Sequence, residues 1–307
     1  MPFYNPYGNF SNRKLNRYKC NFHIHGLTRE ILKEYAASGY GAVTGDNFTG
    51  TIPESGVNVL DGYEYLEKDG ILLIGVNRLI KGAPQSAVNE CNGMGGFCVA
   101  CHPNLAPRIC APESPALSRD EILSLEGLTG IEVFNGCLLE NAEAGHGIGD
   151  PCAADVWDEA LSLGRAIWGF GNDDSHGGAG INRAWTEVFA PSNRYADIYR
   201  AVGEGRLCAS TGLTLLRFDC DGKELSVEAG YPDPDRRGHA VEYRFIGRAG
   251  RIISVQRGES GMLRLDSREP YVRAEALGDG GERLWTQPLC NLSNFNFLPG
   301  ECAYEND

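Results

Sequence analysis

The first two thirds of the chain alternate between short β-like runs and helical patterns, and this alternation limits the possible folds more than any other feature. Parallel strands joined by crossover helices give such an order. The β-like runs are 19–25, 40–46, 61–67, 96–102, 130–136, 165–173 and 185–190, and the helical patterns are 28–39, 118–127, 153–164 and 194–205. About seven strand-helix units favour an α/β fold built as an incomplete or distorted TIM-like barrel, with an open sheet as the alternative.

The helical patterns stop after the segment ASTG at 209–212. The β-like runs that follow, separated by Gly- and Asp-rich breaks, are 240–247, 251–257, 261–266, 269–277 and 282–289. Consecutive short strands of this kind are typical of a small all-β sandwich. We therefore expect an N-terminal arm at 1–18, a barrel at 19–212 and a β-sandwich domain at 213–307.

Composition narrows the classes of partner. The formal net charge of -13 argues against bulk nucleic acid as a ligand, because a phosphate backbone is met by clustered Lys and Arg. No apolar run is long enough for a membrane helix, and the N-terminus has no apolar signal core, so we expect a cytoplasmic protein with no membrane partner. The eleven cysteines are scattered and odd in number. Reduced thiols are expected, with Cys98 and Cys101 as small buried hydrophobes.

Two histidines, His23 and His25, stand one residue apart in the first β-like run, CNFHIHG. Residues i and i+2 of a strand point to the same face, so both imidazoles should project together. His102 and His176 also lie at the ends of β-like runs, and the carboxyl ends of barrel strands form the active site in folds of this type. The four histidines therefore predict one cluster.

Carboxylates are expected at the same level of the barrel: Asp46, Glu64, Glu132 and Asp174. Collected at one mouth they would repel one another, and a bound cation is the natural compensation. Mixed histidine and carboxylate ligands suit Zn, Mn or Fe better than Ca or a thiolate-bound metal.

In this order the motifs HIH, TGDN, YEY, CHPN and DDSH resemble those of the PHP (polymerase and histidinol phosphatase) family, over roughly residues 19–212. The resemblance implies a distorted (β/α)7 barrel with two or three metal ions that mostly hydrolyses phosphate esters. It also implies that His23, His25, Glu64 and Asp174 hold one ion and that Glu64 bridges to a second ion on His102. The aspartate or histidine that usually follows His-x-His is missing here, so we expect two divalent ions, with Asp46 as a weak ligand.

The chemistry expected from this resemblance is phosphoester hydrolysis by a metal-bound hydroxide acting on a small phosphorylated substrate. Asp46 or His176 would accept or deliver a proton, and Arg108 and Arg183 are candidate phosphate clamps. An amidohydrolase-like hydrolase shares the His-x-His and the late Asp, and a degenerate PHP domain could act as a binding module. The sequence does not indicate the substrate, the identity of the metal or the oligomeric state.

Overall fold

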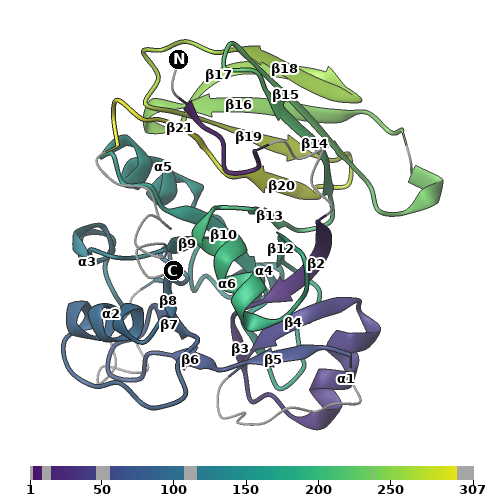
Figure 1. Ribbon diagram of the computed structural model, residues 1–307. Coiled ribbons are helices and arrows are strands. Elements are labelled where there is room, and N and C mark those ends of the chain that lie inside the picture. Colours follow the sequence, from purple (N-terminus) through teal and green to yellow (C-terminus); the bar gives the residue numbers. More distant parts are fainter. Residues whose placement is uncertain (1–2, 9–14, 46–55, 107–115, 237, 296–307) are drawn as a thin grey trace.

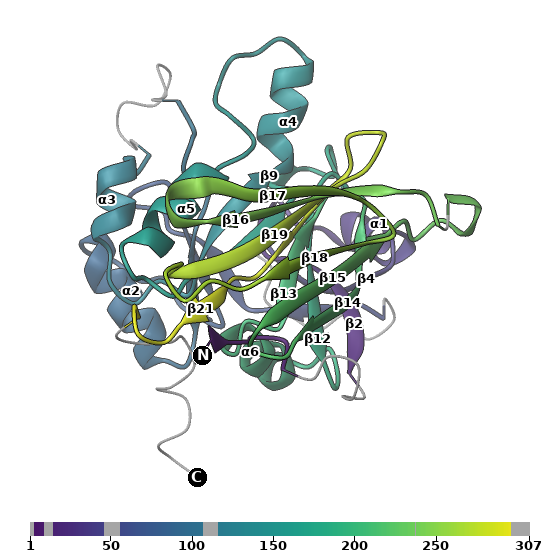
Figure 2. The same ribbon diagram turned by 90° about the horizontal axis from the view of Figure 1, so that it is seen from above.

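The computed structural model describes residues 3–8, 15–45, 56–106, 116–236 and 238–295, and it has a mixed α/β fold rich in strands. An α/β lobe with the helices lies below a layer of long antiparallel strands, which come mostly from the last third of the chain (Figure 1). Viewed from above, these strands cross the lobe, and α4 projects from one side (Figure 2). Among the described residues, no helix is both long and apolar enough to cross a membrane.

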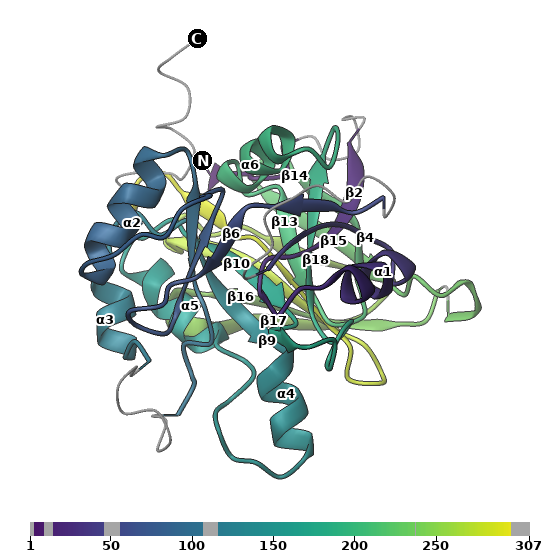
Figure 3. The same ribbon diagram turned by 90° about the horizontal axis from the view of Figure 1, so that it is seen from below.

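The four predicted helices are confirmed: α1 (Arg29–Ala37), α3 (Arg119–Ser124), α5 (Ala154–Ser162) and α6 (Tyr195–Gly203). Side-chain caps fix two of their starts. Thr28 accepts from the backbone N–H of Ile31, and Ser118 forms a reciprocal capping box with Glu121. Two further helices, α2 (Pro84–Gly93) and α4 (Gly136–Glu143), were not predicted. Seen from below, α2 and α3 lie on the side of the lobe opposite α1 (Figure 3).

The strands of the α/β lobe form two main sheets rather than one ring. Their bounds are β2 (Asn16–Asn21), β3 (Ile24–His25), β4 (Tyr40–Thr44), β5 (Asn58–Leu60), β6 (Gly62–Glu64), β7 (Ile71–Ile74), β8 (Phe97–Ala100), β9 (Gly130–Asn135), β10 (Trp168–Asn172), β11 (Ser175–His176), β12 (Trp185–Ala190) and β13 (Leu207–Ser210). One sheet runs β10-β9-β8-β7-β6, and the other contains β13-β12-β2-β4-β5. A small parallel pair, β3 with β11, brings His25 beside His176.

The expected succession of parallel strands is only partly present. β2, β4 and β5 are parallel, as are β8, β9 and β10, but β6-β7, β7-β8 and β2-β12 are antiparallel. The loop between β6 and β7 is too short for a crossover helix, so these strands form a hairpin. Among the described strands the hydrogen bonding does not close into a barrel.

The remaining strands build the antiparallel layer. They are β1 (Phe3–Tyr4), β14 (Thr214–Cys220), β15 (Glu224–Gly230), β16 (Val241–Gly247), β17 (Arg251–Gly258), β18 (Ser260–Arg264), β19 (Tyr271–Leu277), β20 (Arg283–Thr286) and β21 (Leu289–Asn291), with short 3-10 turns η2 (Pro234–Arg236) and η3 (Arg248–Gly250). β14, β15 and β18 form a three-stranded sheet, whereas β16, β17, β19, β20 and β21 belong to the large sheet. β14 and β15 were missed by the sequence analysis.

The α/β lobe and the antiparallel layer are joined by one β-sheet and by one hydrophobic cluster. β13 pairs with β20, so one sheet continues across residue 213, and β1 pairs with β21 although it comes from the expected N-terminal arm. The Gln287 side chain also binds both backbone polar groups of Gly169 on β10, at 2.7 and 2.8 Å. Buried Trp285 packs in the same hydrophobic cluster as Ile131 of β9. The strands on either side of residue 213 thus form one continuous structure.

Candidate metal centre

His23 and His25 come together where β2 ends and β3 begins. Their Nε2 atoms are 3.2 Å apart, and each lies 3.2 Å from Asp174 Oδ1. His23 is fully enclosed, whereas His25 keeps about a fifth of its side chain exposed. The structure thus brings these three side chains together.

The two carboxylate oxygens of Glu64, at the end of β6, face different histidines. Oε2 lies 3.6 Å from His23 Nε2 and 3.4 Å from His25 Nε2. Oε1 lies 3.0 Å from His102 Nε2, just after β8. The carboxylate therefore stands between the first histidine pair and the third histidine.

His102 and Asp174 have backbone conformations that residues other than glycine rarely adopt. Their φ angles are +32° and +52°, in the left-handed region. Such strain persists where the surrounding structure imposes it, and it is concentrated at functional sites. Here it falls on two of the residues whose side chains meet in the cluster.

Glu132, on β9, lies behind the cluster rather than within it. Four donors use its oxygens: His23 Nδ1 at 3.2 Å and Asn172 Nδ2 at 2.9 Å on Oε1, and the His102 N–H at 2.7 Å and Asn135 Nδ2 at 2.8 Å on Oε2. By accepting from Nδ1 of His23, Glu132 leaves Nε2 as the ring nitrogen that faces the cluster. This position differs from the ligand position expected from the sequence.

His176 lies at the edge of the cluster, with 60% of its side chain exposed. Its ring stacks on that of His25 with centroids 4.4 Å apart, and its Nδ1 donates to the Asp174 carbonyl oxygen at 2.9 Å. Its nearest approach to the Asp174 carboxylate is 3.8 Å. The structure therefore brings His176 to the cluster without placing it among the closest atoms.

Asp173, which the sequence analysis did not single out, holds the segment that carries Asp174. It is fully buried and accepts from Asn21 Nδ2 at 2.7 Å, Tyr40 Oη at 3.0 Å and the backbone N–H of Arg183 at 2.7 Å, among other donors. Burial raises the pKa of Asp173, and these hydrogen bonds oppose that rise. The two adjacent aspartates therefore differ in role: Asp173 is surrounded by hydrogen-bond donors, whereas Asp174 faces His23 and His25.

The electrostatics of the cluster couple the histidines to the carboxylates. Burial opposes the charge of His23, but Asp174 and Glu132 outweigh it and hold the pKa of His23 well above its ordinary value. Burial also opposes the charge of His102, and the carboxylate of Glu64 nonetheless raises the pKa of His102 to about 9. Burial tends to raise the pKa of Asp174, yet His23 and its neighbours lower it to about 2. The pocket thus favours positive charge close to its carboxylates.

The donor atoms fit a metal ion in both chemistry and spacing. A tetrahedral ion with bonds of about 2.0 Å separates its ligand atoms by about 3.3 Å. His23 Nε2, His25 Nε2 and Asp174 Oδ1 are each 3.2 Å from the other two, close to that spacing, and Glu64 Oε2 lies 3.6 and 3.4 Å from the two histidine nitrogens. Asp174 Oδ1 is buried and has no hydrogen-bond partner among the described residues. Residues with metal-ligand atoms within 4.8 Å of one another form two sets: His23, His25 and Asp174, and His23, Glu64, Cys101 and His102.

The remaining predicted site residues are Asp46, Arg108 and Arg183. Asp46 and Arg108 are outside the described residues. The guanidinium of Arg183 makes an ion pair with Glu143 of α4 at 2.8 Å, while its backbone N–H binds Asp173. The guanidinium of Arg183, expected to bind phosphate, is therefore paired with the carboxylate of Glu143.

Two neighbours of the cluster were missed by the sequence analysis. Asp69 is buried in the β6-β7 turn, with Oδ1 3.5 Å from His102 Nε2. Cys101, assigned to the apolar core, places Sγ 3.5 Å from Glu64 Oε1. An aspartate in a DG turn and a cysteine in an apolar run carry no signal of their own, because both are common without any ligand.

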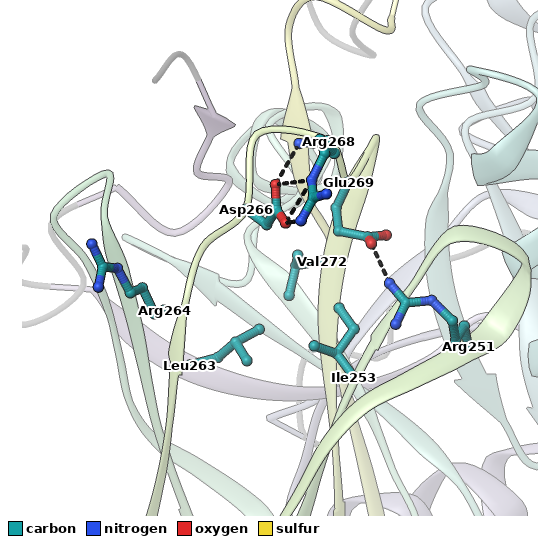
Figure 4. A pocket seen from close by; sticks show the side chains of 8 residues that line it. All are labelled: Arg251, Ile253, Leu263, Arg264, Asp266, Arg268, Glu269 and Val272. Atoms are coloured by element: carbon teal, nitrogen blue, oxygen red, sulfur yellow. Dashed lines mark hydrogen bonds and ion pairs between the residues drawn. The ribbon is translucent and has the colours of Figure 1, made fainter.

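A separate hollow of about 420 Å³ lies on the antiparallel layer, far along the chain from the histidines (Figure 4). Its floor is apolar, with Ile253, Leu263 and Val272, and arginines stand at its rim. Arg251 pairs with Glu269, and Arg268 pairs with Asp266. None of its lining residues belongs to the two ligand sets.

Comparison with known proteins gives little beyond this geometry. No family model matches the sequence, and no curated protein matches it.

A solved two-domain protein from Bacteroides vulgatus ATCC 8482, containing a predicted PHP-like metal-dependent phosphoesterase, is 12% identical over 93% of both chains, with a TM-score of 0.44. Native alpha-2-macroglobulin from Escherichia coli is 14% identical over 34% of this chain and 48% of its own, with a TM-score of 0.20. A β-glucuronidase from Ruminococcus gnavus is 13% identical over 24% of this chain and 14% of its own, with a TM-score of 0.17. Likenesses of this size assign no family.

Proposed function

We propose that the chain is a metal-dependent hydrolase, and that its reaction is the hydrolysis of a small phosphate ester. The observation that carries the proposal is the meeting of three donor atoms, Nε2 of His23, Nε2 of His25 and Oδ1 of Asp174, each 3.2 Å from the other two. Glu64 Oε2 lies 3.6 and 3.4 Å from the two histidine nitrogens. Under this proposal the fold is a distorted variant of the PHP type. The Bacteroides protein that contains a PHP-like phosphoesterase is consistent with it but adds no weight.

Two ions are proposed, with Glu64 shared between them. Oε2 would join His23, His25 and Asp174 at the first ion, and Oε1 would join His102 at the second. Zn, Mn and Fe suit such ligands. When bound, the ions would supply Lewis-acid stabilisation of the phosphoryl oxygens and lower the pKa of water toward neutrality.

The protein's own groups would orient the ligands and move protons. Glu132 keeps the His23 ring in one tautomer through its bond to Nδ1. His176 donates from Nδ1 to a backbone carbonyl, so Nε2 of its exposed ring is the nitrogen free to accept a proton. We assign His176 the transfer of a proton to or from the leaving group. Arg183 could bind the phosphate of the substrate only if its ion pair with Glu143 breaks.

Metal analysis combined with a hydrolysis screen tests the proposal. The purified chain, loaded separately with Zn, Mn or Fe, would be assayed on p-nitrophenyl phosphate and on bis(p-nitrophenyl) phosphate. We expect about two ions per chain and hydrolysis of at least one substrate. His23→Ala should remove metal and lower hydrolysis by about 100-fold or more, whereas His239→Ala, which lies outside both ligand sets, should change neither.

The other readings of the sequence are outcomes of the same screen. An amidohydrolase-like enzyme would bind metal and cleave amide substrates but neither phosphate ester. A binding module would hold metal tightly and cleave none of the substrates. Absence of bound metal after loading would contradict all three.

A further inference from the structure

We propose that the thiolate of Cys101 is a ligand of the second ion, which makes the two metal sites chemically different. The first site would be built from nitrogen and oxygen atoms alone, and the second would combine oxygen, nitrogen and sulfur. The inference rests on the proposed function in one respect, the presence of a second ion beside Glu64 and His102.

The spacing of the donor atoms supports a sulfur ligand. Cys101 Sγ lies 3.5 Å from Glu64 Oε1, and His102 Nε2 lies 3.0 Å from the same oxygen. With bonds of about 2.3 Å to sulfur and about 2.0 Å to oxygen, a tetrahedral zinc ion separates those two ligands by about 3.5 Å. The thiol thus lies at the distance from Glu64 Oε1 expected of a ligand of the same ion, and the ligand atoms of Glu64, Cys101 and His102 all lie within 4.8 Å of one another.

The backbone explains how two consecutive residues can face one carboxylate. In a regular strand Cys101 and His102 would point to opposite faces. The φ angle of +32° at His102 breaks that alternation directly after β8, and both side chains then reach Glu64 Oε1.

The other described cysteines provide the contrast. Cys98 lies three residues earlier on β8 and is equally buried, but its sulfur contacts the Val88 carbonyl and Asn92 at 3.8 to 3.9 Å. Cys208 does approach a carboxylate, that of Glu187 at 3.7 Å, yet no histidine accompanies it. Among the described residues, Cys101 is the cysteine found in a set of metal-ligand groups.

Cobalt provides a direct readout, because a thiolate on Co²⁺ gives a sulfur-to-metal charge-transfer band in the near ultraviolet that nitrogen and oxygen ligands do not give. The chelator-treated full chain would be titrated with Co²⁺ while the absorption spectrum is recorded. We expect the band to develop with the second ion rather than with the first. Cys101→Ser should abolish the band and weaken that ion by about 10- to 100-fold, with the first ion unchanged.

Matched variants assign the band to one sulfur. Cys98→Ser removes an equally buried thiol from β8, which ends one residue before Cys101, and should keep the band. Cys110 and Cys302 lie outside the described residues, so the double variant Cys110→Ser, Cys302→Ser is included and should also keep it. If Cys101→Ser does not fold, Cys101→Ala, which leaves no polar side-chain atom at this buried position, takes its place in the titration.

Two results separate the failure of this inference from the failure of the proposed function. If two cobalt ions bind and no charge-transfer band develops, Cys101 is not a ligand, while the two-ion hydrolase remains supported. If no cobalt binds at all, both proposals fall. A band that survives Cys101→Ser, or that disappears in either control, would also overturn the assignment.

Discussion

Each oxygen of Glu132 accepts two hydrogen bonds, so this carboxylate has little capacity left for another partner. We expect Glu132→Gln to bind metal about 10- to 100-fold more weakly, because the amide would set an N–H group against at least one of the four donors and release the His23 ring. The free energy of unfolding should fall by about 1–3 kcal/mol. Chelator competition and urea unfolding measure the two effects.

The control for this variant is Glu228→Gln, on a partly buried strand position that belongs to neither ligand set. It should leave metal affinity unchanged. Equal affinity in Glu132→Gln and the unmodified chain would show that Glu132 does not orient His23.

The pKa of His102 makes the stability of the metal-free chain depend on pH. Its folded-state pKa, raised to about 9 by Glu64 against the effect of burial, lies above its ordinary value of 6.5. The stabilisation is therefore fully present below about pH 6.5 and is lost as the pH rises through about 9. The free energy of unfolding, measured with urea in the presence of chelator, should fall between pH 6.5 and about pH 9. The fall should be smaller for His102→Gln than for the unmodified chain. Equal declines would contradict the coupling.

Sequence reasoning at this scale identified the groups with a periodic signal and missed those without one. His23 and His25 follow from strand alternation, and His102, Glu64 and Asp174 follow from their places at strand ends. Asp69 and Cys101 enter the cluster through a turn and a left-handed residue, which no alternation predicts. Glu132 was placed among the ligands because sequence shows that a carboxylate faces the site but not which donors already occupy it.

At the scale of elements, the start of α4 is packed against the segment that carries Asp174. An added Cβ at Gly136 would lie 2.9 Å from the backbone oxygen of Asp173 and 2.8 Å from Arg183 Cβ. We expect Gly136→Ala to lower the free energy of unfolding by about 1–3 kcal/mol, because the helix and the Asp173 segment must move apart. Metal affinity should fall with it, as measured by chelator competition.

Gly93→Ala in α2 is the matched control for this substitution. A Cβ there meets nothing within 4 Å, so the change should be neutral or should stabilise by up to about 1 kcal/mol. If both variants behave alike, close packing at Gly136 does not constrain the site.

Elements were predictable where local signals were strong. α1 and α3 have capping residues and apolar periodicity, and both were predicted. α2 begins at Pro84 without a side-chain cap, and α4 follows β9 directly, so its first residue was read as part of the strand. β6 and β8 were expected as successive parallel units because β7, which pairs antiparallel with both of them, was not predicted as a strand.

At the scale of the whole molecule, a buried ion pair joins the two layers. Arg273 of β19 donates to both oxygens of Asp158 on α5, at 2.8 and 2.6 Å, and both side chains are almost fully buried. Arg273→Met should lower the free energy of unfolding by about 3–5 kcal/mol, because Asp158 is left charged and buried. Adding Asp158→Leu should recover much of that loss in urea unfolding. A double variant as unstable as the single one would rule out this electrostatic cause.

The pairing of β13 with β20 has a consequence for the exchange of amide hydrogens. Since that junction lies inside one continuous sheet, its amides should exchange with solvent only when the whole chain opens. A metal ion that binds only the folded chain suppresses that opening in proportion to its concentration. Loading the histidine cluster should then slow exchange at Cys208 and Ser210, although neither residue belongs to a ligand set.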